Sequence, residues 1–255
     1  MITHDFPILE FDEDKNAFIR PKDVVKPVEL PSRCVICFFG EAIGKIIKEI
    51  PNRIAAHFSA ESAFFPVYEL DYRGEKIALI QAGVGAPVGA FQIEELCAMG
   101  CKKIIACGSC GVLENDIAVG HLIIPTSAIR DEGTSYHYVK ASREIEANTE
   151  AVNAIEKTMI EKKVPYIKGK TWTTDAFYRE TPAKIKHRKN EGCITVEMEA
   201  SAYMAVSQYN NIEFGQILYG GDNLGGEVWD SRNFYTKTDI REFVLRLALD
   251  ACLSL

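Results

Sequence analysis

Two acidic residues, Glu197 and Glu199, stand where the pattern predicts that a short buried strand over 192–196 gives way to a helix over 200–208. In an open α/β sheet, ligands bind in the crevice outside the carboxyl ends of the strands. A carboxylate there is costly to bury, but it offers several acceptor sites for vicinal hydroxyl groups. The alternative is that both acids simply favour the positive end of the helix dipole.

The rest of the chain alternates between predicted strands and helices from Arg33 onward. We therefore expect one α/β domain over 33–255, preceded by an arm over 1–32 that wraps the domain or a neighbouring subunit. The predicted strands are 34–39, 67–72, 76–82, 103–107, 121–130, 166–172, 192–196 and 214–219, and the predicted helices are 41–50, 88–99, 149–162, 200–208 and an apolar stripe over 240–251.

Three glycine-bearing turns are expected after strands, at 39–40, 82–85 and 107–111. Glycine lets a backbone approach a ligand closely and leaves its N–H groups free to point at it, so the three turns together suggest a ligand cradle. A dinucleotide site is the obvious rival. However, the segment Gly83–Gly89 has one residue too many for that fingerprint, and no acid ends the next strand.

Composition is that of an ordinary globular protein, with 255 residues, 47% hydrophobic residues and a net charge of -7. The negative charge argues against a nucleic-acid surface, and the basic run Lys184–Lys189 is interpreted as the solvated face of a helix. No apolar run is long enough to span a membrane, and the first residues lack the pattern of a signal peptide.

Eight cysteines raise the possibility of a metal site or disulfides. Cys34 and Cys37 are three residues apart on a predicted strand and would point to opposite faces, and no His/Cys pair follows Cys110 at zinc-finger spacing. We expect buried free thiols, no metal and a cytoplasmic protein.

Several segments together resemble the nucleoside phosphorylase family, which includes purine nucleoside phosphorylase, uridine phosphorylase and the adenosylhomocysteine nucleosidases. The resemblance implies a three-layer α/β/α sandwich around a mixed, partly barrel-like sheet, and a homo-oligomer such as a dimer or hexamer. The matching segments are Ala82–Pro87, Ile104–Gly111, Val119–Ile124, Arg130–His137, Thr173–Tyr178, Val196–Ala200 and Gly220–Asp222.

The chemistry that the resemblance implies is cleavage of the ribosyl N-glycosidic bond of a nucleoside. In this interpretation Glu199 accepts hydrogen bonds from the ribose hydroxyls, Met198 packs against the sugar, and Glu197 lies at the same turn. Phe177 and Tyr178 match the aromatic pair beside the nucleobase, although Tyr178 could equally be a core residue.

Asp222 matches the acid that purine-specific members use at the base, where protonation of a purine nitrogen creates a neutral leaving group. An ordinary glycine-rich turn is the alternative for this segment. Uridine-specific members read their base with a Gln and an Arg, where this chain has Thr181 and Ala183. The sequence therefore favours a purine nucleoside, with uridine as the alternative, and it implies no organic cofactor.

The family's phosphate-binding arginines are missing, because their positions hold Gly44, Ala106 and, in a weaker alignment, Ala63. Gly40, Gly108 and Ser109 of the glycine turns remain to bind the nucleoside and an anion, and Lys45 or Arg53 would have to supply a cation. Three hypotheses follow: phosphorolysis with inorganic phosphate as co-substrate, which is slightly favoured, hydrolysis by water, and nucleoside binding without turnover.

Two further residues are weaker candidates. Relatives place a histidine of the arm at the 5′-hydroxyl of the neighbouring subunit's ligand, which corresponds to His4 here. Arg232 follows the acid-bearing segment by about one helical turn and is a candidate for supporting Asp222.

Overall fold

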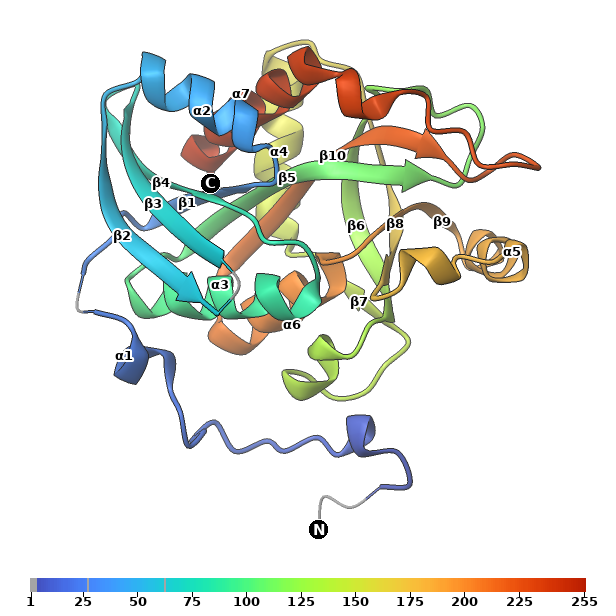
Figure 1. The fold of residues 1–255 in the computed structure, drawn as a ribbon, viewed down its shortest axis with the longest axis horizontal. Helices are drawn as coiled ribbons and strands as arrows, with labels where there is room; N and C mark the ends of the chain where they lie inside the picture. The colour runs from blue at the N-terminus through green and yellow to red at the C-terminus, as the bar shows by residue number, and fades with distance from the viewer. Residues whose placement is uncertain (1–3, 27, 62) are drawn as a thin grey trace.

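Ten strands form one mixed sheet, one end of which closes into a barrel (Figure 1). The protein is described by a computed structural model that covers residues 4–26, 28–61 and 63–255. The strands are β1 (Arg33–Cys37), β2 (Asn52–Ala60), β3 (Ala63–Tyr72), β4 (Glu75–Gln81), β5 (Lys103–Val112), β6 (Leu122–Asp131), β7 (Glu144–Glu146), β8 (Tyr166–Thr174), β9 (Cys193–Glu197) and β10 (Glu213–Asn223).

The barrel arises because β5 pairs with both β9 and β10. Starting from β10, the strand order is β10-β6-β8-β9-β5, and the parallel β10–β5 pairing closes this ring. The sheet then continues outward from β5 through β1, β4, β3 and β2. Parallel neighbours bring the carboxyl ends of β1 and β5 to the same edge, which is where a ligand site is expected.

Helices cover both faces of the sheet, with α2, α4 and α7 on one side and α3 and α6 on the other (Figure 1). Helix α5 lies outside the barrel near β9, and the short α1 lies in the arm (Figure 1). The helices are α1 (Pro21–Val24), α2 (Gly40–Glu49), α3 (Ala86–Ala98), α4 (Thr149–Glu161), α5 (Pro182–Asn190), α6 (Ala200–Asn210) and α7 (Thr238–Ser254), with 3-10 turns η1 (Pro7–Leu9), η2 (Thr134–His137), η3 (Phe177–Arg179) and η4 (Phe234–Thr236).

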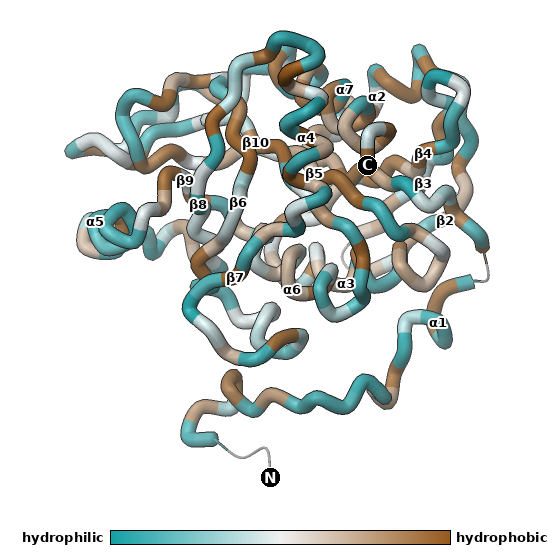
Figure 2. The backbone as a smooth tube through the Cα atoms, turned by 180° about the vertical axis from the view of Figure 1, so that it is seen from behind, coloured by the Kyte–Doolittle hydropathy of each residue, from teal (hydrophilic) through white to brown (hydrophobic). Residues whose placement is uncertain are grey.

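Each face of the sheet has its own hydrophobic core, and the apolar stretches of the chain gather along the central strands between them (Figure 2). Ile46 of α2 and Leu247 of α7 belong to the first core, and Ile93 of α3 and Tyr203 of α6 belong to the second. The observed architecture confirms the predicted α/β/α sandwich with a mixed, partly barrel-like sheet.

The cysteines follow the same division. Cys37 lies in the first core and Cys34 in the second, so these two thiols point to opposite faces of β1 as the strand period requires. All eight cysteines are free, and only Cys97 is partly exposed.

The structure differs from the sequence-based expectations in local detail. The segment 107–111 is not a turn but the end of β5, and Gly220, Gly221 and Asp222 lie within β10. These strands run on because they pair with each other as far as Asn223 and Val112, a long-range contact that a turn-like local sequence cannot reveal. Strand β2 was not predicted, because most of its residues are exposed and its apolar alternation is weak.

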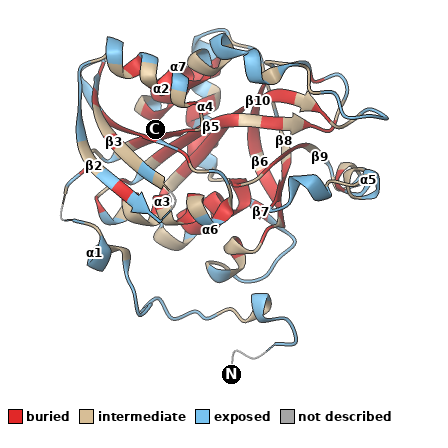
Figure 3. Ribbon diagram, viewed as in Figure 1, coloured by how far each residue is buried: buried red, intermediate tan, exposed pale blue. Residues whose placement is uncertain are grey.

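Residues 4–26 and 28–32 run as a largely exposed segment, which passes below α3 and α6 (Figure 3). The Lys15 Nζ atom donates to the Tyr209 carbonyl at 3.0 Å, and Lys140 pairs with Glu13 at 2.5 Å, so the arm is tied to its own domain at these points. Within the described part of the chain, no helix combines the length and the apolar character that crossing a membrane requires.

Candidate active site

A cavity of about 720 Å³ opens at the carboxyl ends of β1 and β9 and beside the last residues of β5 and β10. Seven of the residues predicted for the site line this one cavity, although they come from four separate parts of the chain. They are Ser109, Phe177, Tyr178, Glu197, Met198, Glu199 and Asp222.

Glu197 is the last residue of β9, and its carboxylate accepts hydrogen bonds from other groups of the protein. Its Oε2 atom accepts the backbone N–H groups of Glu199 and Ala200 at 2.7 and 2.6 Å, and its Oε1 atom accepts the Thr173 hydroxyl at 2.6 Å. Two orphan N–H groups at the start of α6 are thereby satisfied. The geometry of Glu197 therefore agrees with the alternative in which an acid stabilises the start of a helix.

Glu199 also lines the cavity, and it differs from Glu197 in that its carboxylate reaches across to the turn before α3. Its Oε1 atom accepts the N–H of Gly85 at 2.5 Å. Gly85 precedes α3 and has φ +100°, a conformation that favours glycine, so the glycine turn at 82–85 positions this acid. Only 5% of Glu199 is exposed.

Burial raises the pKa of both glutamates, and the charge of Glu197 raises the pKa of Glu199 further. Glu197 accepts hydrogen bonds at both of its oxygens. Burial disfavours the charge on Glu199, and a positive charge that develops next to Glu199 would favour that charge.

Aromatic residues and a second acid line another part of the cavity. Phe177 and Tyr178 form η3, with ring centroids 4.0 Å apart, and they are 50% and 88% exposed. A core role for Tyr178 is thus inconsistent with the structure. The Trp229 indole N–H donates to Oδ2 of Asp222 at 2.6 Å, which fixes the Asp222 carboxylate at the cavity wall.

Glu180 was missed in the sequence although it also lines the cavity. It ends the 3-10 turn of the aromatic pair, and its N–H bonds to the Phe177 carbonyl at 3.2 Å. Burial and the nearby Asp222 raise the pKa of Glu180 to about 7. Its position two residues after Tyr178 could have indicated in the sequence that Glu180 lies near the site.

Arg241 of α7 is the second missed residue, and it brings a guanidinium group to the cavity. Its Nε atom donates to the Tyr219 hydroxyl at 3.2 Å, its Nη1 atom pairs with Glu41 at 2.6 Å, and it lies 5.3 Å from the Phe39 ring centroid. Ser109 is the register partner of Tyr219 in the β5–β10 pairing, which places Ser109 near Arg241. Arg241 lies far from these residues in sequence, so no local pattern could have revealed it.

The two cations proposed from the sequence are engaged elsewhere. Lys45 pairs with Glu242 at 3.0 Å, Arg53 pairs with Glu69 at 2.6 Å, and neither lines the cavity. Both cations are exposed, and these ion pairs hold them on the outer surfaces of α2 and β2.

Four other predicted site residues do not line the cavity. Gly40 begins α2, and Gly108 packs under the Phe38 ring. Arg232 donates to the Ile117 carbonyl at 2.6 Å. The partner of Asp222 is Trp229 and not Arg232. His4 is exposed on the arm, where its Nδ1 accepts the Phe6 N–H, and a role in a neighbouring subunit stays a prediction.

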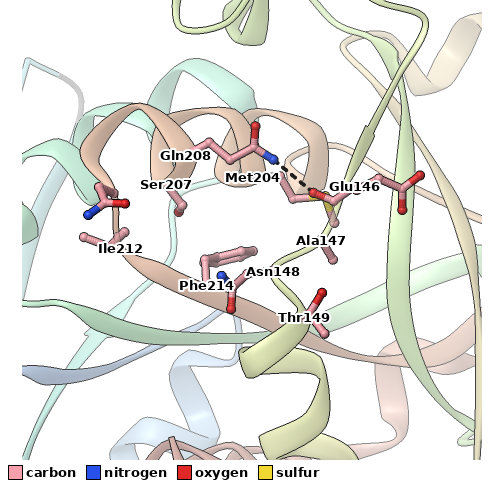
Figure 4. A pocket seen from close by; sticks show the side chains of 10 residues that line it. Glu146, Ala147, Asn148, Thr149, Met204, Ser207, Gln208, Ile212 and Phe214 are labelled. Carbon is pink, nitrogen blue, oxygen red and sulfur yellow. Dashed lines mark hydrogen bonds between the residues drawn. The ribbon is translucent and has the colours of Figure 1, made fainter.

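A smaller cavity of about 370 Å³ lies between α6, β10 and the start of α4 (Figure 4). Ser207 points into it, and the Gln208 side chain donates to the Glu146 carbonyl at 3.1 Å (Figure 4). It shares no lining residue with the larger cavity and contains none of the predicted site residues.

The closed barrel and the sheet that extends from it place a buried acid and exposed aromatic rings around one cavity, an arrangement suited to a small-molecule ligand. Residues 32–252 match the phosphorylase superfamily, and the chain therefore belongs to this family. Family and site together make the protein a nucleoside phosphorylase-like pentosyltransferase.

Known relatives agree on the family but differ in substrate. The chain is 28% identical over 206 residues to the guanosine phosphorylase of Halorubrum lacusprofundi, covering 77% of this chain and 83% of the relative. It is 38% identical over 107 residues to the uridine phosphorylase of Thermococcus kodakarensis, covering 42% and 39%. The fold is similar to that of purine nucleoside phosphorylase from Toxoplasma gondii, with a TM-score of 0.75, 20% identity and coverage of 94% and 97%.

Proposed function

We propose that the protein phosphorolyses a purine nucleoside to the free base and ribose 1-phosphate. The observation that carries this proposal is the buried Glu199, which lines the cavity and is held there by the N–H of Gly85. We also propose that it acts as a cytoplasmic homo-oligomer, a dimer or hexamer, without an organic cofactor.

Glu199 supports cleavage because one carboxylate can both bind the ribose hydroxyls and attract the positive charge that develops on the sugar. A carboxylate can accept hydrogen bonds from two vicinal ribose hydroxyls, while Met198 beside it offers an apolar contact to the sugar. As the glycosidic bond breaks, positive charge develops on the ribosyl ring. Burial disfavours the Glu199 charge in the empty site, so the attraction is gained mainly in the transition state.

The residues at the base favour a purine. Phe177 and Tyr178 offer exposed rings for stacking, and Asp222 is fixed by Trp229 where a base nitrogen would be met. At the positions that read uracil in uridine-specific relatives, Thr181 caps α5 by accepting the Lys184 N–H, and Ala183 has no polar side chain.

Arg241 supports phosphate as the acceptor. Its guanidinium group lines the cavity near Ser109, and among the described residues no hydrogen bond uses its Nη2 group. Guanidinium groups bind phosphate through charge-assisted hydrogen bonds, so one arginine from α7 would partly replace the arginines lost at Gly44 and Ala106.

Hydrolysis is the second candidate, and the pairing of Arg241 with Glu41 favours it. Among the described residues, Arg241 is the only arginine that lines the cavity. The negative charge of Glu41 weakens the attraction of this guanidinium group for phosphate. Water would then attack the ribosyl carbon.

The decisive experiment measures base release from inosine, guanosine, adenosine and uridine with and without inorganic phosphate. Phosphorolysis predicts phosphate-dependent release and ribose 1-phosphate as product, with purines preferred. Release that is independent of phosphate would establish hydrolysis instead. Nucleoside binding by calorimetry without any base release would identify a binding protein and end the proposal.

A further inference from the structure

Two carboxylates from different elements line the same part of the cavity, beside the exposed aromatic pair. Glu180 follows η3, and Asp222 lies near the end of β10. Two acids in different surroundings can divide the roles of proton donor and hydrogen-bond acceptor.

Asp222 has a hydrogen-bond donor within the protein. The indole N–H of Trp229 donates to its Oδ2 atom at 2.6 Å. This hydrogen bond fixes the orientation of the carboxylate at the cavity wall.

Glu180 lies in the opposite situation. Among the described residues no hydrogen bond reaches its carboxyl group, and the charged groups that face it are Asp222 from β10 and Lys184 from α5. The Lys184 ammonium is drawn to Asp131 at 3.3 Å, where Arg188 also binds. Burial and Asp222 therefore dominate, and they raise the pKa of Glu180 to about 7. A carboxylic acid with such a pKa is half protonated at neutral pH.

We propose that Glu180 is the catalytic acid that protonates the leaving purine, and that Asp222 orients the base by accepting one of its N–H groups. This inference rests on the proposed function. The proton moves from the Glu180 carboxyl to a ring nitrogen of the base as the N-glycosidic bond breaks. The electron pair of that bond goes to the base, a phosphate oxygen bonds to the ribosyl carbon, and Glu180 is left as a carboxylate that regains a proton from solvent.

The test compares E180Q and D222N on two substrates. Inosine needs a proton on its leaving base, whereas 7-methylinosine, assayed in its cationic form, carries the positive charge already. We expect E180Q to lower kcat on inosine by about 10²- to 10⁴-fold, the usual contribution of a general acid, and to leave kcat on 7-methylinosine near that of the wild type.

A pH profile provides a second readout. The wild-type kcat on inosine should fall as the pH rises through the pKa of Glu180, near 7, because the protonated acid is the active form. E180Q should lose this limb of the profile, which a purely structural role would not change. Melting curves of E180Q and E180A would show whether either variant has lost the fold.

Two results would overturn the role of Glu180 alone: equal effects of E180Q on both substrates, or the selective loss on inosine in D222N instead. If the wild type releases no base from either nucleoside, the proposed function itself fails, and the role of Glu180 fails with it. The behaviour of the wild type thus separates the two failures.

Discussion

Glu197 and Glu199 are separated by a single residue, yet the structure gives them different tasks. Glu197 satisfies the start of α6 and accepts the Thr173 hydroxyl. Glu199 lines the cavity and accepts the N–H of Gly85. Their identical chemistry therefore allows a matched comparison, in which one variant should affect activity and the other stability.

For Glu199→Gln, we expect kcat/KM for the nucleoside to fall by about 10²- to 10³-fold, because the amide removes the charge that favours the transition state. Thermal unfolding should change little. Glu150→Gln, on the exposed start of α4, is the matched control and should leave kinetics unaltered. Unchanged kinetics in Glu199→Gln would refute the assigned role.

For Glu197→Gln, the expected effect is on stability. A neutral amide cannot accept both N–H groups and the hydroxyl as a carboxylate does, so we expect the free energy of unfolding to fall by about 1–3 kcal/mol. Urea denaturation monitored by circular dichroism measures this change. An unaltered unfolding midpoint would show that the bonds to the start of α6 contribute no net stability.

At the scale of elements, α7 contributes to both the core and the site. Its apolar side packs into the first core through residues such as Leu247, and Arg241 near its start reaches the cavity. Arg241 also pairs with Glu41 of α2, the helix that follows the glycine turn of β1, so a residue remote in sequence is brought to the cavity.

Arg241→Met should raise the KM for phosphate by about 10- to 100-fold, which corresponds to the loss of one charge-assisted hydrogen-bonding group. The effect on the KM for the nucleoside should be smaller. Arg246→Met is the matched control, because Arg246 lies on the same helix, pairs with Glu242 and Glu49, and does not line the cavity. Equal phosphate constants in the two variants would remove Arg241 from the acceptor site.

At the scale of the whole molecule, two cores share one sheet, and thiols are buried in both. Cys34, Cys97, Cys101 and Cys252 lie close enough to influence one another, and burial raises the pKa of Cys97 and of Cys252 to about 12. Such thiols react slowly, because the thiolate is the nucleophile.

A thiol titration tests this arrangement. In the native protein, Ellman's reagent should modify fewer than one thiol per chain over minutes, since only Cys97 is partly exposed. After unfolding in guanidinium without a reductant, all eight thiols should react. A lower count in the unfolded protein would reveal a disulfide and contradict the free-thiol arrangement.

The sequence by itself determined the alternation of strands and helices, the opposite orientations of Cys34 and Cys37, and the position of Glu199 between β9 and α6. These features depend on periodicity and short-range spacing, which are properties of the local chain. The family motifs around them extended that prediction to the fold.

Only the tertiary structure decided the closure of the barrel between β5 and β10, the engagement of Glu197, and the arrival of Glu180 and Arg241 at the cavity. Each depends on contacts between segments far apart in sequence or on which atoms are already satisfied. Pairing and desolvation are set by the packed molecule, so two glutamates with the same intrinsic chemistry can serve a helix and a ligand.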